Sequence, residues 1–271
     1  MEVLKKYNIK YLSPSSISSF ISNPSIYVLE KIFGYKFTAG AAAFRGTFIE
    51  QGVHLVIANK EDVEKVAQLQ LSNFIEYCKQ MGIQKDEYEK ELPFIDRAIK
   101  KLPSELSQFG KIVGYQKEVG YEHNGVKIKG YTDFEFKNKD NLLFVDLKTT
   151  GRSISTPSFK VSTAHKIQQY IYSKATNVEN KLFYIQVLKT KENIEEYSLT
   201  QEDEIQIPCI IDQAINNIIT LCSLANSKDD FKRLVTPNPD DWKWSKDKIK
   251  AVEGVASPKK AVGNIRAAAA P

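Results

Sequence analysis

The apolar residues of the first hundred positions recur at helical spacing. Ser13-Pro14 and Asn23-Pro24 each combine a capping side chain with a proline at the first helical position, a pair that opens helices. We therefore expect one helix from Ser13 to Ile21 and a second from Pro24 to about Phe33, stopped by Gly34. Three longer helices are expected to follow, at about 41–58, 61–80 and 85–102.

From Lys111 onward the apolar period shortens to two residues, which indicates strands. The dipeptide Asn124-Gly125 is typical of a tight hairpin turn between two of them. The elements expected here are strands at 112–121, 126–136 and 142–148, a helix at 162–176, strands at 182–188 and 194–199, and a helix at 202–225. This order predicts a mixed α/β fold rather than a doubly wound parallel sheet.

The elements divide the chain into three expected regions. Residues 1–110 form a helical region, residues 111–235 form the α/β core, and residues 236–271 form a basic, partly flexible tail. With 42% hydrophobic and 26% charged residues, the 271-residue chain has the composition of a globular protein. No apolar run approaches the ~20 residues of a membrane span, so no membrane partner is expected. The first residues lack an apolar signal segment, which favours a cytoplasmic location, the host cytoplasm if the protein is phage-encoded.

The positive charge is concentrated near the C-terminus. Residues 243–266 carry seven lysines and arginines against two acids, an excess that equals the net charge of +5 of the whole chain. Such a segment suits association with a polyanion, although a solubilising tail that binds nothing has the same composition.

Two acidic residues and a lysine stand where two of the expected strands run side by side. Asp133 and Asp146 lie on the two arms of a hairpin and are expected to converge at one end of the sheet. Two neighbouring carboxylates favour a hard cation such as Mg²⁺ or Mn²⁺. Lys148 shares a strand face with Asp146 and is therefore placed to orient or deprotonate a water molecule. The alternative is a solvated ion pair on an exposed strand, but the apolar residues before Asp146 argue for burial.

These residues resemble the motifs of the PD-(D/E)XK nuclease superfamily, in particular its RecB-like and phage exonuclease branch. The resemblance covers about residues 12–190 and rests on motifs in the family's order. They are Leu12–Ser16, Phe44–Glu50, Gly130–Asp133, Asp146–Thr149, and Gln168 with Tyr172, preceded by His165.

The resemblance implies a restriction-endonuclease-like core, a mixed central sheet flanked by helices, with an N-terminal helical region that adds one motif to the site. It implies that Asp133 and Asp146 bind Mg²⁺ or Mn²⁺, that the backbone carbonyl of Leu147 is a further ligand, and that Lys148 is the catalytic lysine.

One motif departs from the RecB-like pattern. Many RecB-like members have histidine four residues after the motif glycine, whereas Glu50 stands four residues after Gly46 here. By resemblance to other branches, Glu50 is the expected metal ligand. His54 lies one helical turn further on the same face and is expected beside the ligands, with a purely packing histidine as the alternative.

The other motif residues are expected to support the site. Gln168 and Tyr172 are four residues apart on a helix, with His165 one turn before them, so their side chains point to one side. They are expected to position Lys148 or a phosphate, although such residues also serve as ordinary helix–sheet contacts. The residues expected to contact DNA flank these motifs; they are Arg45, Thr149, Arg152 and Lys160.

Cysteine usage argues against a metal cluster or a disulfide framework. The three cysteines, Cys78, Cys209 and Cys222, are far apart in the sequence. Related cluster-binding nucleases have Cys-Pro after the first helix and three cysteines near the end, whereas this chain has Asn23-Pro24 and no cysteine after Cys222. No iron–sulfur cluster is therefore expected.

Together these features predict a Mg²⁺- or Mn²⁺-dependent deoxyribonuclease, by resemblance an exonuclease of DNA recombination, repair or phage DNA processing. DNA is the expected partner, with a recombination or single-strand-binding protein as a further one. The alternative is a DNA-binding or assembly protein that keeps the fold without cleaving. The retained pair of acids and the lysine favour the enzyme.

Overall fold

The computed structural model describes residues 2–35, 39–150, 154, 156, 159–178, 180–187 and 192–236. The chain divides into two compact units. Met1–Thr38 and Ile211–Pro271 form the first, and Ala39–Ile210 forms the second. This division differs from the expected boundaries at residues 110 and 235, because the first two predicted helices group with the C-terminal segment rather than with the helices that follow them.

The described part of the first unit is helical. Its elements are α1 (Glu2–Lys6), α2 (Pro14–Ser22), α3 (Pro24–Lys31), the second half of α9 (Gln201–Leu224) and α10 (Phe231–Leu234). The predicted proline-led starts are present: Ser13 caps α2, and the Asn23 side chain accepts the backbone N–H groups of Ser25 (3.1 Å) and Ile26 (3.4 Å) at the start of α3. The core of this unit joins chain ends that are distant in sequence. The ring of Tyr7 packs edge-on against Phe231, with ring centroids 4.9 Å apart.

The second unit begins with a helical layer. Its elements are α4 (Ala41–Asn59), α5 (Val63–Gln80), α6 (Lys85–Tyr88), a 3₁₀ turn (Glu89–Glu91) and α7 (Leu92–Leu106). The helical stretch expected at about 85–102 is therefore present but divided into three pieces: α6, the 3₁₀ turn and α7. Pro93 stands in the first turn of α7, where its missing N–H removes no helical hydrogen bond, while Leu92 before it keeps helical backbone, and α7 then continues through Pro103. Helices α4, α5 and α7 pack closely at Gly52, where an added Cβ would lie 2.6 Å from Ile99 and 3.1 Å from Gln70.

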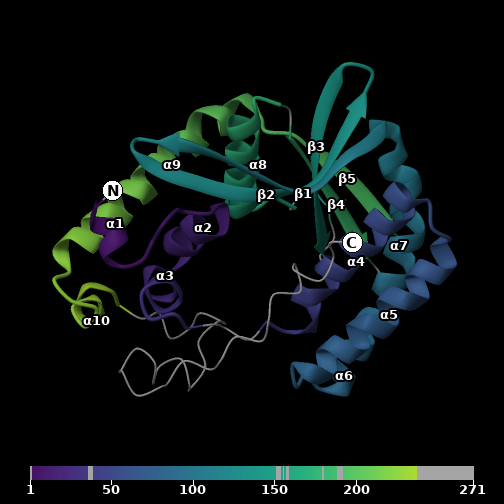
Figure 1. The fold of residues 1–271 in the computed structure, drawn as a ribbon, viewed down its shortest axis with the longest axis horizontal. Helices are drawn as coiled ribbons and strands as arrows, with labels where there is room; N and C mark the ends of the chain where they lie inside the picture. Colours follow the sequence, from purple (N-terminus) through teal and green to yellow (C-terminus); the bar gives the residue numbers. More distant parts are fainter. Residues whose placement is uncertain are drawn as a thin grey trace. The chain divides into compact units, whose positions relative to one another are not determined.

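Among the described residues, a five-stranded mixed sheet follows the helical layer (Figure 1). Its strands are β1 (Lys111–His123), β2 (Val126–Asn138), β3 (Asn141–Thr150), β4 (Asn180–Val187) and β5 (Glu192–Tyr197). They lie in the order β1-β2-β3-β4-β5, all antiparallel except the parallel pair β3–β4. That pair is connected through α8 (Thr163–Thr176), since parallel neighbours need a crossover.

Alternation along the central strands separates packing from chemistry. Phe134, Val145 and Leu147 join the apolar core that α4, α5 and α7 build on one side of the sheet. Asp146, between Val145 and Leu147, points to the opposite face, where it meets Gln168 of α8. The predicted fold class, a mixed α/β core with an N-terminal helical region, is confirmed.

Helix α9 qualifies one expectation from the sequence. It is 24 residues long, with a mean hydropathy of 1.4 in its most apolar window, so length and composition would suffice for a membrane span. The core helix of a globular protein meets the same criteria, and 39% of that window is buried here. The expectation that no apolar segment is long enough to cross a membrane therefore does not hold for α9 by length and composition.

Candidate active site

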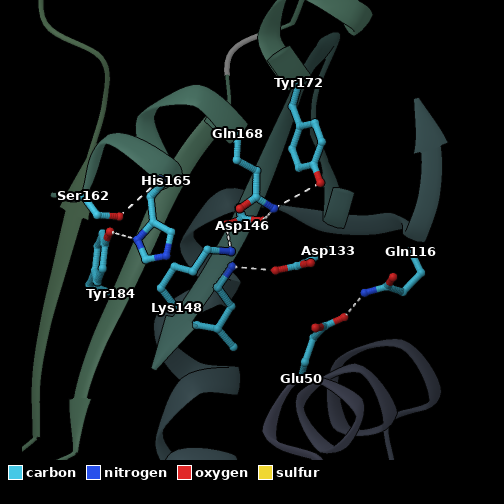
Figure 2. A network of polar contacts seen from close by, with 11 residues as sticks. Glu50, Gln116, Asp133, Asp146, Lys148, Ser162, His165, Gln168, Tyr172 and Tyr184 are labelled. Carbon is cyan, nitrogen blue, oxygen red and sulfur yellow. Dashed lines mark hydrogen bonds and ion pairs between the residues drawn. The ribbon is translucent and has the colours of Figure 1, made fainter. Parts of the chain in front are cut away.

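The two predicted acids face each other on neighbouring strands. The ladder between β2 and β3 ends at the pair Phe134↔Val145, so Asp133 stands opposite Asp146 where the two strands separate. Here the Asp133 carboxylate replaces a ladder contact and accepts the backbone N–H of Leu147 at 2.9 Å (Figure 2). Both acids are buried, Asp146 completely and Asp133 to 8% exposure. Since buried carboxylates are rare without compensation, this end of the sheet is built for charge.

Repulsion among the acids favours the protonated form of Asp133. Burial raises the pKa of Asp133 well above its usual value, and the negative charges of Asp146 and Glu50 raise it further. The Lys148 ammonium and the Leu147 N–H act in the opposite direction without cancelling the rise. A cation placed among these carboxylates would relieve the repulsion.

Lys148 supplies positive charge beside Asp146. It lies two residues further along β3 and forms an ion pair with Asp146 Oδ2. Burial lowers the pKa of Lys148, but the charges of Asp146 and Asp133 raise it by more, so the net pKa lies above its usual value. Lys148 is therefore an ammonium in the ligand-free protein. In that form it donates hydrogen bonds and orients an oxygen but accepts no proton.

Helix α8 holds Asp146 from above the sheet. The amide nitrogen of Gln168 donates to Asp146 Oδ1 at 3.0 Å and to the Tyr172 hydroxyl at 3.1 Å. Tyr172 in turn lies so close to β2 that a Cβ at Gly130 would be 2.5 Å from its ring. The glycine of the Gly130–Asp133 motif is thus explained by packing: only a residue without a side chain lets α8 approach the strand that carries Asp133.

Behind Lys148 lies a pair that the sequence analysis only half identified. His165 Nδ1 is hydrogen-bonded to the hydroxyl of Tyr184, which stands opposite Lys148 on the neighbouring strand β4. Burial first, and then the charge of Lys148, lower the pKa of His165 to about 4, so its imidazole is neutral at neutral pH. Tyr184 was missed because it sits within an apolar run that reads as a plain buried strand.

Glu50 reaches the site from α4. Its carboxylate accepts a hydrogen bond from the side-chain amide of Gln116 on β1 (Figure 2). Helix α4 passes the end of β3 at the motif glycine Gly46, where an added Cβ would lie 3.6 Å from Thr149 Oγ1, an ordinary van der Waals distance that does not by itself require glycine. Gln116 was not anticipated, because nothing in the sequence pattern marks it as different from its neighbours.

His54 is placed by packing. Its ring stacks on Tyr115 with centroids 3.9 Å apart and an interplanar angle of 14°. Burial lowers the pKa of His54, which favours the neutral ring. These contacts agree with the packing alternative for His54 while keeping it one turn from Glu50 on α4.

We expect Glu50→Gln to raise the concentration of divalent metal required for activity at least tenfold. We expect His54→Ala to raise that concentration only mildly. Hard cations prefer a carboxylate to an imidazole, and His54 is engaged with Tyr115. Titration of activity against Mg²⁺ and Mn²⁺ for both variants checks this. An inactive His54→Ala beside an active Glu50→Gln would place the ligand one turn further along α4.

The residues expected to contact DNA differ in their exposure and contacts. Arg45 is only 7% exposed, pairs with Glu91 and lies over the ring of Phe94, so it is a structural ion pair rather than a phosphate contact. Thr149 is half-buried near the end of β3, and Lys160 is exposed ahead of α8. Arg152 and the basic segment 243–266 lie outside the described residues.

The donor set fits a hard divalent cation, although it is not a closed cage. Within the described part of the chain, no three histidine, cysteine, aspartate or glutamate side chains converge closely enough to hold an ion by themselves. Asp133 and Asp146 nevertheless offer facing carboxylate oxygens, and the charge of Glu50 already acts on Asp133. Oxygen donors of this kind suit Mg²⁺ or Mn²⁺. The Leu147 carbonyl remains a predicted ligand.

Comparisons with known proteins agree with this geometry. A model of the PD-(D/E)XK nuclease superfamily matches residues 11–247. A candidate exonuclease from Eubacterium rectale has a similar solved structure, with 16% identity and a TM-score of 0.56 over 98% of this chain and 95% of that one. At this identity the likeness shows the fold alone.

Two further comparisons add no argument. The solved structure SSO0001 matches with 22% identity and a TM-score of 0.31 over 48% of this chain and 67% of that one. No curated protein shows a significant match. The family model, in contrast, spans most of the sequence and includes both facing acids and the lysine beside them. The chain belongs to the PD-(D/E)XK nuclease superfamily.

Proposed function

We propose that this protein is a Mg²⁺- or Mn²⁺-dependent deoxyribonuclease, an exonuclease that hydrolyses phosphodiester bonds in DNA recombination, repair or phage DNA processing. One observation carries the proposal: two buried carboxylates, Asp133 and Asp146, face each other with the Lys148 ammonium beside them. The exonuclease designation of the Eubacterium rectale protein and the resemblance to the RecB-like branch support the finer assignment.

The chain's own groups divide the work. A divalent cation bound by Asp133 and Asp146 would supply Lewis acidity toward the scissile phosphate. Lys148 carries its proton and donates to an oxygen of water or phosphate, while Asp146 holds the ammonium in place. Gln168 fixes the Asp146 carboxylate through Oδ1, so that its orientation survives when Lys148 turns toward substrate.

The neutral pair behind Lys148 keeps the charge balance of the site. Because His165 is uncharged at neutral pH, it adds no second cation next to Lys148. Tyr184 holds the imidazole from the neighbouring strand. Among the described residues in this part of the site, Lys148 is then the only cation that would meet the phosphate. The metal ion would supply the remaining positive charge.

Cleavage of end-labelled linear DNA and of closed-circular DNA, with Mg²⁺, Mn²⁺ or EDTA, tests the proposal. An exonuclease shortens the linear substrate from its ends, leaves the closed circle intact and stops in EDTA. Cutting of the circle would contradict the exonuclease assignment alone. Metal-independent binding without cleavage of either substrate would instead identify a DNA-binding protein that keeps the nuclease fold.

The basic tail is expected to strengthen binding rather than catalysis. Truncation after Trp244 removes six of the seven positive charges of the segment 243–266. Each lost phosphate contact lowers the slope of log affinity against log salt by about 0.9 for duplex DNA. We therefore expect weaker binding with a flatter salt dependence and nearly unchanged turnover at saturating DNA. Equal salt slopes for the full-length and truncated proteins would show that the tail has no part in binding.

A further inference from the structure

Gln116 has an unusual backbone conformation for its place in the fold. Its φ of 49° lies in the left-handed region, which residues other than glycine and asparagine rarely adopt. The other non-glycine residues with positive φ among those described stand at turns or helix ends; they are Asn8, Lys60, Asn124, Lys139 and Asn177. Gln116 alone of this group lies inside a strand. Gln116 lies next to the candidate active site and not in a turn, so its strained backbone indicates a functional role.

The register places Gln116 directly beside the acids. The flanking pairs Tyr115↔Phe134 and Lys117↔Thr132 put Gln116 opposite Asp133, at a step where no strand pairing is formed. Gln116, Asp133 and Asp146 therefore occupy one row across β1, β2 and β3. A shift of register between Ile112 and Gly114 precedes this row, and bulges of this kind re-aim side chains near active sites.

The side chain of Gln116 joins this row to α4. Its amide nitrogen donates to Glu50 Oε1 (Figure 2). A carboxylate only accepts hydrogen bonds, so the nitrogen of the amide must face Glu50 and the oxygen must face away. That oxygen, Oε1, is buried and has no hydrogen-bond partner among the described residues. A buried acceptor without a donor is costly, which indicates that a proton donor such as water joins it when the site is filled.

We propose that Gln116 is a positioning residue that holds the Glu50 carboxylate at the edge of the site, from where it joins Asp133 and Asp146 when a divalent cation binds, so that the cation meets three carboxylates instead of two. The inference rests on the proposed metal-dependent function. A carboxylate has several lone pairs on its two oxygens, so Glu50 keeps the bond to Gln116 while it binds a cation. The strained backbone serves this purpose because it turns the amide out of the strand and toward α4.

Mn²⁺ binding measured without DNA, by electron paramagnetic resonance and calorimetry, tests the role of Gln116. The Gln116→Gly variant removes the amide, and glycine accepts the left-handed backbone, so the protein is expected to unfold at an equal or higher temperature in EDTA. Its Mn²⁺ affinity is expected to fall on the order of tenfold or more. Lys139→Gly, which relieves positive φ in the β2–β3 turn, is the matched control and should bind Mn²⁺ as the wild type does.

A double-variant cycle shows whether Gln116 acts through Glu50. In a Glu50→Gln background, Gln116→Gly should cause no further loss of Mn²⁺ affinity. Gln116→Asn also tolerates the left-handed backbone but carries a shorter amide; it should weaken binding similarly and serves if the glycine variant fails to fold.

The possible failures are distinguishable. Unchanged or tighter Mn²⁺ binding by Gln116→Gly would overturn the positioning role alone, and tighter binding would mean that Gln116 holds Glu50 away from the ion. Additive losses in the double variant would also overturn it, because Gln116 would then act independently of Glu50. A wild-type protein that binds no Mn²⁺ would overturn the proposed function and this inference together.

Discussion

Lys148→Met and Asp146→Asn are each expected to lower the rate of DNA cleavage by at least about a thousandfold, roughly 4 kcal/mol of activation free energy. Asp146 is completely buried and is bound by both Gln168 and Lys148, so its replacement removes a candidate metal ligand and the anchor of the ammonium at once. Lys148→Met removes the only charged donor described on this strand end but keeps the length of the side chain.

Matched controls separate chemistry from folding. Lys174→Met changes an exposed lysine on α8, and Asp140→Asn changes an exposed acid in the turn at the other end of the β2–β3 hairpin. Both controls should cleave DNA like the wild type. Circular dichroism and thermal unfolding should show folded protein for all four variants. More than about a tenth of the wild-type rate in either site variant would remove that residue from the catalytic machinery.

The facing acids were predictable because their placement is local. A hairpin joins Asp133 to Asp146, the alternation of strand residues puts Lys148 on the face of Asp146, and helical spacing puts Gln168 and Tyr172 on one side. Each of these relations follows from the geometry of one or two elements.

What the sequence could not show depends on contacts between distant segments. The partner of Arg45 is Glu91, 46 positions later, on a helix turn that had been predicted as part of a longer helix. Tyr184 gains its place only because β4 pairs in parallel with β3. No local pattern encodes the positive φ of Gln116, since glutamine carries no preference for it. Pro93, in contrast, was a signal: a proline eight residues into a predicted helix is grounds for dividing it.

Asp133→Asn is expected to stabilise the metal-free protein at neutral pH while abolishing cleavage. The folded protein raises the pKa of Asp133 through burial and through repulsion from Asp146 and Glu50. Asparagine keeps the size of the side chain and an oxygen for the Leu147 N–H, but it carries no charge. Because the pKa of Asp133 is higher in the folded than in the unfolded protein, its ionisation costs the wild type stability, and the free energy of unfolding of Asp133→Asn should be higher at neutral pH.

The gain should depend on pH in a defined direction. Below the unfolded pKa of about 3.9, Asp133 is protonated in both states and the wild type loses nothing. Above that value the unfolded chain ionises while the folded one still binds its proton, so the wild type loses stability as pH rises, up to the raised pKa of the folded state. The advantage of Asp133→Asn should therefore be absent near pH 3.5, grow through this window and then level off.

Chemical denaturation in EDTA across this pH range measures the difference between the two proteins, and addition of Mg²⁺ gives an independent reading of its cause. If the wild type is destabilised by mutual repulsion of its acids, Mg²⁺ should raise its unfolding temperature and leave that of Asp133→Asn nearly unchanged, because binding to the folded state alone stabilises it. A constant difference between the proteins from pH 3.5 to 8 would show that Asp133 contributes through packing rather than charge. The acids at the end of β2 and β3 would then not be the strained cation site that their burial and their facing positions indicate.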